Sequence, residues 1–168
     1  MIVVKVGGSL FGDVRTGPAL KRWLADQSAP VLLIPGGGAF AEAVRDADRI
    51  HSLGQEASHW LALRSLSVSG ALLKELIRPI ETPILDCFDY FRDRDSLPHS
   101  WDVTTDSLAL KVALDLGAME LILLKSTENP APGDWKRATE LGFVDPHFPK
   151  LIGQASFPIR SVNFRGLV

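Results

Sequence analysis

The sequence of 168 residues has one cysteine, Cys87, no long hydrophobic run and no excess of charge of one sign. One cysteine excludes an internal disulfide and a cysteine-based zinc site, which suits a reducing compartment. The apolar stretches, such as Leu121–Leu124, are far shorter than the roughly 20 residues of a membrane-spanning helix. Lys and Arg total 18 against 20 Asp and Glu, and the signs are interspersed, so a nucleic-acid-binding surface is not indicated. No signal-peptide pattern follows Met1, so we expect a cytoplasmic protein.

The composition is that of an ordinary globular chain, with 46% hydrophobic and 23% charged residues. The length predicts a single domain over residues 1–168. Short apolar runs without polar alternation are typical of strands that are covered on both faces. Three such runs are present: Ile2–Val6, Val31–Ile34 and Leu121–Leu124.

Helical patterns lie between these runs. Further elements are predicted by apolar spacing, capping residues and Gly or Pro boundaries. They are helices over Thr16–Asp26, Ala39–Ile50, Gln55–Ile77 (with Gly70 as a candidate break), Thr105–Leu116 and His147–Gln154, and strands over Ile84–Phe88 and Ile159–Phe164. Because strands and helices alternate, we predict an α/β fold, a three-layer αβα sandwich with a mainly parallel central sheet.

The first candidate site motif is Lys5-Val6-Gly7-Gly8-Ser9, a lysine in an apolar strand that runs into two glycines. Buried lysines are rare unless paired, and glycines after a strand let backbone N–H groups approach an anion. The motif therefore fits a phosphate cradle with a cation behind it. The motif is equally consistent with an edge strand on which Lys5 faces water.

The second motif, Pro35-Gly36-Gly37-Gly38-Ala39, places three glycines between a strand and a helix, where anions bind. No Gly-Lys-Ser/Thr follows, which excludes a Walker A loop. Gly36, Gly38 and Ala41 satisfy G-x-G-x-x-A, so a nicotinamide dinucleotide site is an alternative. The acidic residue that such a site needs is absent at the required distance, since Asp86 comes much later.

The third motif, Trp101-Asp102-Val103-Thr104-Thr105-Asp106, enters a helix. Thr104 or Thr105 can cap that helix, and Asp106 falls in its first turn, where the helix dipole favours an anion. By itself the motif predicts only a helix start.

Together and in this order, the three motifs resemble the amino acid kinase family, which includes acetylglutamate, aspartate, glutamate and uridylate kinases. The resemblance implies an ATP-dependent phosphotransferase that uses Mg-ATP on a small metabolite. In such a site Lys5 contacts the transferring phosphoryl group, Asp106 orients the lysines, and a second lysine is Lys150 in Pro149-Lys150 or, as runner-up, Lys125. The implied residues are catalytic Lys5, Asp106 and Lys150, nucleotide-binding Gly7, Gly8, Ser9, Lys125 and Ser126, and acceptor-binding Gly36, Gly37, Gly38, His59, His99 and Trp101.

A narrower likeness is to the small archaeal-type kinases of methanofuran biosynthesis, which phosphorylate an aminomethylfuran phosphate. Four segments carry it: His59–Ala62, Pro98–Thr104, Leu124-Lys125 and Gly142–Asp145. This likeness implies a small phosphomonoester acceptor, with His59, His99 and Trp101 as contacts. The alternative is that these side chains are ordinary core and surface residues.

The chain departs from the family after Leu124, where Lys125-Ser126-Thr127 stands in place of an Asp-x-x-Gly-Val segment and a sizeable nucleotide lobe. We therefore divide it into an acceptor and phosphate part, residues 1–118, and an abbreviated nucleotide part, residues 119–168. Either a minimal ATP site remains, or the protein is a non-catalytic or partner-dependent binding subunit. By analogy with the family we expect a homodimer or higher homo-oligomer, and we assign no metal ligand.

Overall fold

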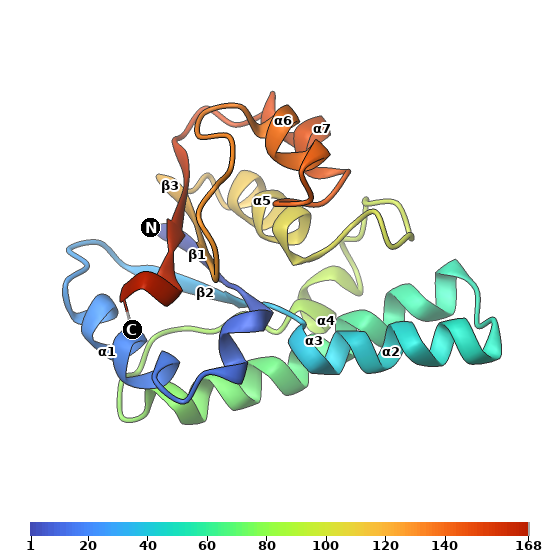
Figure 1. Ribbon diagram of the computed structural model, residues 1–168, viewed down its shortest axis with the longest axis horizontal. Helices are drawn as coiled ribbons and strands as arrows, with labels where there is room; N and C mark the ends of the chain where they lie inside the picture. Colours follow the sequence, from blue (N-terminus) through green and yellow to red (C-terminus); the bar gives the residue numbers. More distant parts are fainter. Residues whose placement is uncertain (168) are drawn as a thin grey trace.

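Four parallel strands form the centre of the molecule (Figure 1). The computed structural model describes residues 1–167. In the order β2-β1-β3-β4, the strands are β2 (Val31–Pro35), β1 (Ile2–Val6), β3 (Glu120–Lys125) and β4 (Ile159–Asn163). The register places Lys5 opposite Ile34 on one side and Leu123 on the other. The predicted parallel sheet is confirmed, and β1 is a central strand rather than an edge strand.

One face of the sheet is covered by α5 (Thr105–Asp115), α6 (Trp135–Glu140) and α7 (Phe148–Ile152). Val3 and Leu123 point to this face and are completely buried, as are Leu110 and Phe148 from the covering helices. In Figure 1 these helices lie in the upper part of the molecule, to the right of β3.

The opposite face is covered by α1 (Thr16–Ala25), the second half of α3 (Gln55–Ile77) and the short helix η2 (Phe164–Leu167). Val4 and Ile122 pack here with Leu20 and Leu73. The helix α2 (Gly38–His51) lies against the first half of α3, and this pair extends past the edge of the sheet (Figure 1). The remaining helices are η1 (Gly8–Gly12) and α4 (Cys87–Phe91).

Alternation along β1 explains the position of its lysine. Successive strand residues face opposite sides, so Lys5 shares the face of Val3 and points toward the layer that contains α5. The residue is only 6% exposed. An ammonium group so deeply buried requires a charged partner.

The predicted helix Gln55–Ile77 forms as one unbroken helix of 23 residues, and Gly70 does not interrupt it. A Cβ at Gly70 would lie 3.5 Å from Pro35 Cγ and 3.6 Å from Ile84 Cγ2. Both distances are ordinary van der Waals contacts, so the packing of α3 on the end of β2 does not require a glycine here. The helix-forming residues on both sides of Gly70 keep α3 continuous through this position.

The predicted strand Ile84–Phe88 is wrong. Ile84 forms an isolated parallel bridge with Leu33, and α4 begins at Cys87. The reason is local, because the Asp86 carboxylate accepts a hydrogen bond from the Asp89 N–H at 3.1 Å and caps the helix.

The short helix α6 was not expected, and it begins at a similar cap, in which the Asp134 side chain accepts from the Arg137 N–H at 2.9 Å. Within residues 1–167, none of the helices is long and apolar enough to cross a membrane.

Candidate active site

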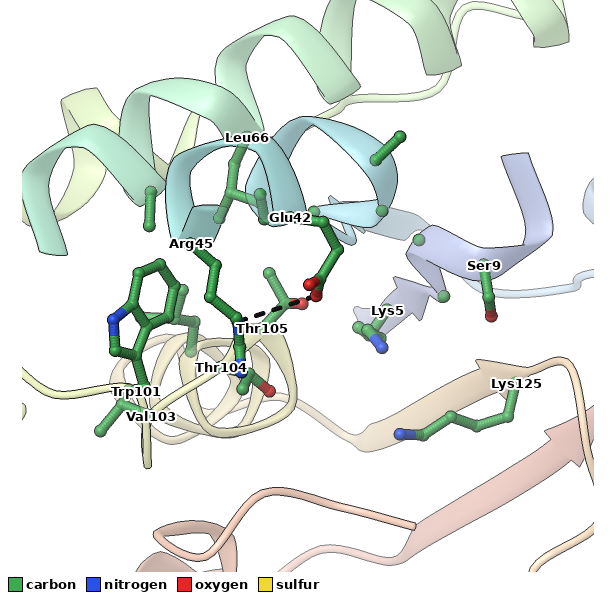
Figure 2. Close-up of a pocket in the computed structure, with 18 of the residues that line it drawn as sticks. Lys5, Ser9, Glu42, Arg45, Leu66, Trp101, Val103, Thr104, Thr105 and Lys125 are labelled. Carbon is green, nitrogen blue, oxygen red and sulfur yellow. Dashed lines mark ion pairs between the residues drawn. The ribbon is translucent and has the colours of Figure 1, made fainter. Parts of the chain in front are cut away.

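A cavity of about 640 Å³ opens at the carboxyl ends of β1, β2 and β3 (Figure 2). Gly7, Gly8 and Ser9 follow β1, the triple glycine 36–38 follows β2, and Ser126 follows β3. Loops at this edge of a parallel sheet are the usual position for ligands in α/β proteins. We call the part lined by Lys5, Lys125 and the two glycine loops the strand end, and the part lined by Glu42, Arg45, His59 and Trp101 the helical end.

At the strand end the two glycine loops pack backbone against backbone. A Cβ at Gly8 would lie 2.1 Å from the Gly38 nitrogen, and one at Gly36 would lie 2.3 Å from the Gly8 nitrogen. Gly38 has a φ of +53°, which disfavours a residue with a side chain. Gly37 caps the 14-residue helix α2, whose N-terminus adds unpaired N–H groups and a positive dipole end. This arrangement suits a phosphate, which needs many donors at short range.

Beneath these loops, two lysines share one buried carboxylate. Lys5 Nζ lies 2.9 Å from Asp106 Oδ1, and Lys125 Nζ lies 2.6 Å from Asp106 Oδ2. The Lys125 ammonium also donates to the Phe143 carbonyl oxygen at 2.6 Å. Burial alone would raise the pKa of Asp106, but the charges of Lys5 and Lys125 outweigh it and hold that pKa below its ordinary value.

Burial and the neighbouring Lys5 charge lower the pKa of Lys125, despite the opposing effect of Asp106. The centre carries two positive charges and one negative charge, so it has a net positive charge available for an anion. Figure 2 shows the two lysine side chains extending into the cavity from neighbouring strands.

Asp106 lies in the first turn of α5, and a second buried carboxylate, that of Asp145, holds this turn in place. Thr104 caps the helix and accepts from the Asp106 N–H at 3.4 Å. Asp145 Oδ2 accepts from the N–H groups of Thr104 and Ser107, both at 3.0 Å, and Asp145 Oδ1 accepts from the Ser107 hydroxyl at 2.5 Å.

Asp145 Oδ1 also accepts from the backbone N–H of Phe148 at 3.0 Å, so one side chain joins the starts of α5 and α7. Sequence reasoning did not give Asp145 this role. Its position just before Pro146 and a short helix was a signal for a capping residue, but not for a contact with α5.

The helical end of the cavity is built from α2, α3 and the segment that enters α5. Arg45 lies with its Cζ 4.6 Å from the centre of the Trp101 ring, and Trp101 Nε1 donates to Asp48 at 2.8 Å. The Arg45 guanidinium also forms a long ion pair with Glu42, at 3.8 Å (Figure 2). Arg45 is thus held over an aromatic ring while its charge is only weakly neutralised.

The structure brings most of the expected site residues to this cavity. Among the residues implied by the resemblance, those that line it are Lys5, Gly7, Gly8, Ser9, Gly37, Gly38, His59, Trp101, Lys125 and Ser126. Ser9 and Ser126 meet through their hydroxyl groups at 2.9 Å. Asp106 and Gly36 do not line the cavity themselves but contact residues that do. Asp106 pairs with Lys5, and Gly36 packs against Gly8.

Two of the expected residues are placed elsewhere. Lys150 is exposed in α7 and does not line the cavity, whereas Lys125, the runner-up, is the second lysine that meets Asp106. His99 lies behind His59, with the two rings stacked at a centroid distance of 3.9 Å.

The cavity lining suits the two implied cofactors, ATP and Mg²⁺, to different degrees. The glycine loops and the two lysines suit the phosphates of ATP. Among the described residues, the cavity lining contains one carboxylate, the exposed Glu42 at the helical end, and both Asp106 oxygens face lysines. The lining therefore lacks the carboxylates with which proteins usually bind Mg²⁺, so this ion fits only as a companion of the ATP phosphates.

Comparison with known proteins gives one sequence relative and several structural neighbours. No protein-family profile matches the chain. The chain is 29% identical, over 198 aligned positions, to the (5-(aminomethyl)furan-3-yl)methyl phosphate kinase of Methanocaldococcus jannaschii, with 98% of this chain and 88% of the relative covered. The alignment is longer than the chain, so the relative has segments that this chain lacks.

Solved structures share the fold. Uridylate kinase from Archaeoglobus fulgidus has a TM-score of 0.67 at 14% identity, covering 96% of this chain and 90% of that one. A substrate complex of isopentenyl phosphate kinase has a TM-score of 0.57 at 13% identity, covering 99% and 93%. The relative and both neighbours are amino acid kinases, and the predicted α/β fold is confirmed. With its parallel sheet, its paired glycine loops and its buried Lys5–Asp106 pair, the chain shares the fold of these amino acid kinases and resembles their family in sequence.

Proposed function

We propose that the protein is an ATP-dependent phosphotransferase whose acceptor is a small metabolite that already carries a phosphate. The observation that carries this proposal is the strand end, where two ammonium groups, buried at Lys5 and partly buried at Lys125, share one carboxylate beneath two glycine loops. Such a centre is suited to hold phosphate charge, through two ammonium groups and the backbone N–H groups of the loops. This matches phosphoryl transfer, which requires mainly positioning and charge neutralisation.

In this function the chain positions two phosphates against one another. Lys5 and the N–H groups of the glycine loops neutralise the group in transfer, while Asp106 keeps both ammonium groups fixed before substrates arrive. Ser9, Lys125 and Ser126 lie toward the nucleotide side. Lys125, rather than Lys150, is the second lysine of this site. ATP supplies the phosphoryl group, and Mg²⁺ enters with it.

The helical end fits an acceptor with charges of both signs. The relative's name describes a furan ring with a phosphate on one arm and an aminomethyl group on the other. Arg45 is suited to the acceptor's phosphate because its guanidinium is preorganised on Trp101 and is only weakly paired. Glu42 is suited to the ammonium group, and the indole of Trp101 to the ring.

The nucleotide part, residues 119–168, is short in this proposal, and ATP lies over the loop that follows β3. A homodimer or higher homo-oligomer is the expected assembly. Its subunits would associate through the outer surface of α2 and α3, where Phe40, Leu61 and Val68 are exposed.

The first test measures ADP formation with Mg-ATP and three acceptors: the aminomethylfuran phosphate of the relative's name, uridine monophosphate and isopentenyl phosphate. We expect turnover with the furan phosphate and much less with the other two. Lys5→Ala, purified in the same way, is the control, and its ADP formation should be far lower. ADP formation with none of the acceptors, together with no Mg-ATP stabilisation of the fold, would contradict the proposal and favour a non-catalytic subunit.

A second test addresses the acceptor's amine. Glu42→Gln should raise KM for the furan phosphate but leave KM unchanged for the same compound without its aminomethyl group. An equal rise for both compounds would remove Glu42 from amine recognition.

A further inference from the structure

A second cluster of titratable side chains lies outside the phosphoryl-transfer centre. It joins His59 of α3 to Asp95 and His99 of the segment between α4 and α5. His59 Nε2 lies 2.6 Å from Asp95 Oδ2, and His99 Nε2 lies 3.0 Å from the same oxygen. The three candidate ligand atoms lie within 4.8 Å of one another. Two segments that are distant in sequence therefore direct two imidazoles and one carboxylate to a common point.

The cluster is shielded and held in place. The His59 and Asp95 side chains are 7% and 8% exposed, and that of His99 is 27% exposed. The other Asp95 oxygen accepts from the Leu97 N–H at 3.0 Å, which leaves Oδ2 for the two histidines.

A further carboxylate fixes the orientation of the His99 ring. Glu56 Oε2 is hydrogen-bonded to His99 Nδ1, and Trp60 Nε1 donates to Glu56 Oε1 at 2.8 Å. A histidine whose second nitrogen is bound by a carboxylate is the usual outer arrangement of a metal-bound imidazole.

We propose that His59, Asp95 and His99 form a binding site for a divalent transition-metal ion of the zinc class. Two imidazole nitrogens and one carboxylate oxygen are ligands that Zn²⁺ and Co²⁺ accept readily, whereas Mg²⁺ and Ca²⁺ prefer oxygen ligands alone. Three protein ligands leave one coordination position for water or another small ligand. His59 also lines the main cavity, so the ion would border the helical end.

The proton balance of binding follows from the hydrogen bonds. Each Nε2 lies within hydrogen-bond distance of Asp95 Oδ2, so a proton on either Nε2 has to leave that nitrogen before it binds the ion. A neutral His99 can keep its one proton on Nδ1, which is bonded to Glu56, and a neutral His59 can keep its proton on Nδ1; any further proton is released to solvent. The two rings are stacked, 10° from parallel, and would have to turn for both Nε2 atoms to bind one ion. No redox step is involved.

The test is a titration of the untagged, chelator-treated full chain with Co²⁺, followed by visible absorption and equilibrium dialysis. We expect one Co²⁺ per chain with the strong visible bands of a tetrahedral site, displaced by one equivalent of Zn²⁺. His59→Gln and Asp95→Asn should each remove the bands, and Glu56→Gln should weaken binding about 10-fold. These readouts do not depend on kinase activity.

Two controls make the test decisive. His51→Asn and His147→Asn change histidines outside the cluster and should leave Co²⁺ binding unaltered. If Asp95→Asn fails to fold by circular dichroism, His59→Gln and Glu56→Gln still report on the site. Absence of stoichiometric binding, or binding that survives in His59→Gln, would overturn the proposal.

Discussion

The two ends of the cavity are built on different principles. At the strand end, Lys5 and Lys125 come from central strands, and their shared Asp106 is buried. At the helical end, Glu42 and Arg45 come from one surface helix, and their side chains are 67% and 46% exposed. Buried charges depend strongly on their partners, whereas exposed ones are screened by water. We therefore expect substitutions of the charged residues to be poorly tolerated at the strand end and better tolerated at the helical end, where the residues can differ with the substrate.

The sharpest test of this comparison is Lys5→Ala. Removal of the central ammonium group should lower kcat by about 10³-fold, because a preorganised charge on the transferring group is lost. Steady-state kinetics with Mg-ATP and the furan phosphate would measure it. Lys136→Ala, which changes an exposed lysine in α6, is the matched control and should keep the original kcat. A kcat in Lys5→Ala close to that of the control would show that the strand end is not the reaction centre.

The next test separates the two candidates for the second lysine. Lys125→Ala should lower kcat/KM for ATP by about 10²-fold, since it removes a partly buried charge that faces the cavity. Lys150→Ala should have a much smaller effect, because that side chain is exposed in α7. The reverse order of effects would restore Lys150 as the second lysine.

Asp106→Asn tests the dependence of the strand end on pairing. The variant leaves two neighbouring ammonium groups without their carboxylate, so the free energy of unfolding at pH 7 should fall by about 3 kcal/mol. Urea denaturation would measure it, with Asp46→Asn of the exposed surface of α2 as control. A loss no larger than in the control would show that the two lysines do not need the carboxylate.

The same variant makes a prediction about pH. The folded pKa of Asp106 lies below its ordinary value, so its carboxylate stabilises the fold fully above the unfolded pKa of about 3.9, and this contribution is lost as pH falls through the lower folded pKa. The unchanged protein should therefore lose more stability than Asp106→Asn as the pH is lowered from about 5 to about 3, a range that spans the unfolded pKa. Urea denaturation at a series of pH values would measure both proteins, and parallel acid profiles would contradict this assignment.

The smallest effect is expected at the helical end. Arg45→Ala should raise KM for the acceptor about 10-fold, which corresponds to loss of about 1.4 kcal/mol of binding, and leave kcat nearly unchanged. The reason is that the proposed acceptor site places Arg45 on the acceptor's phosphate, away from the group in transfer. A fall in kcat as large as that of Lys125→Ala would erase the distinction between the two ends.

Much of the fold followed from local sequence signals. The runs Ile2–Val6 and Leu121–Leu124 are apolar on both faces, and they form parallel strands in the middle of the sheet. The two glycine loops also lie together, as their positions after neighbouring strands indicate. The exception was Ile84–Phe88, where the cap at Asp86 outweighed the apolar residues and started a helix.

The parts of the site that were not predicted depend on contacts between distant segments. The choice between Lys125 and Lys150 is decided by which lysine meets Asp106, and no local pattern contains that information. The hydrogen bonds of Asp145 to the start of α5 and of His59 to Asp95 were missed for the same reason, since each joins residues far apart in the chain. Secondary structure depends mainly on residues that are close in sequence, whereas a charged site depends on tertiary contacts between distant segments.

The placement of Lys5 on the central strand has a consequence for synthesis of the protein. The lysine leaves the ribosome early, long before Asp106 and β3 exist. Until they arrive, β1 has no neighbour on one side, and its ammonium group has no partner that would make burial favourable. We therefore expect β1 to stay hydrated in the growing chain until β3 and Asp106 arrive, and the arrival of β3 is also the moment at which Lys5, Asp106 and Lys125 can first pair.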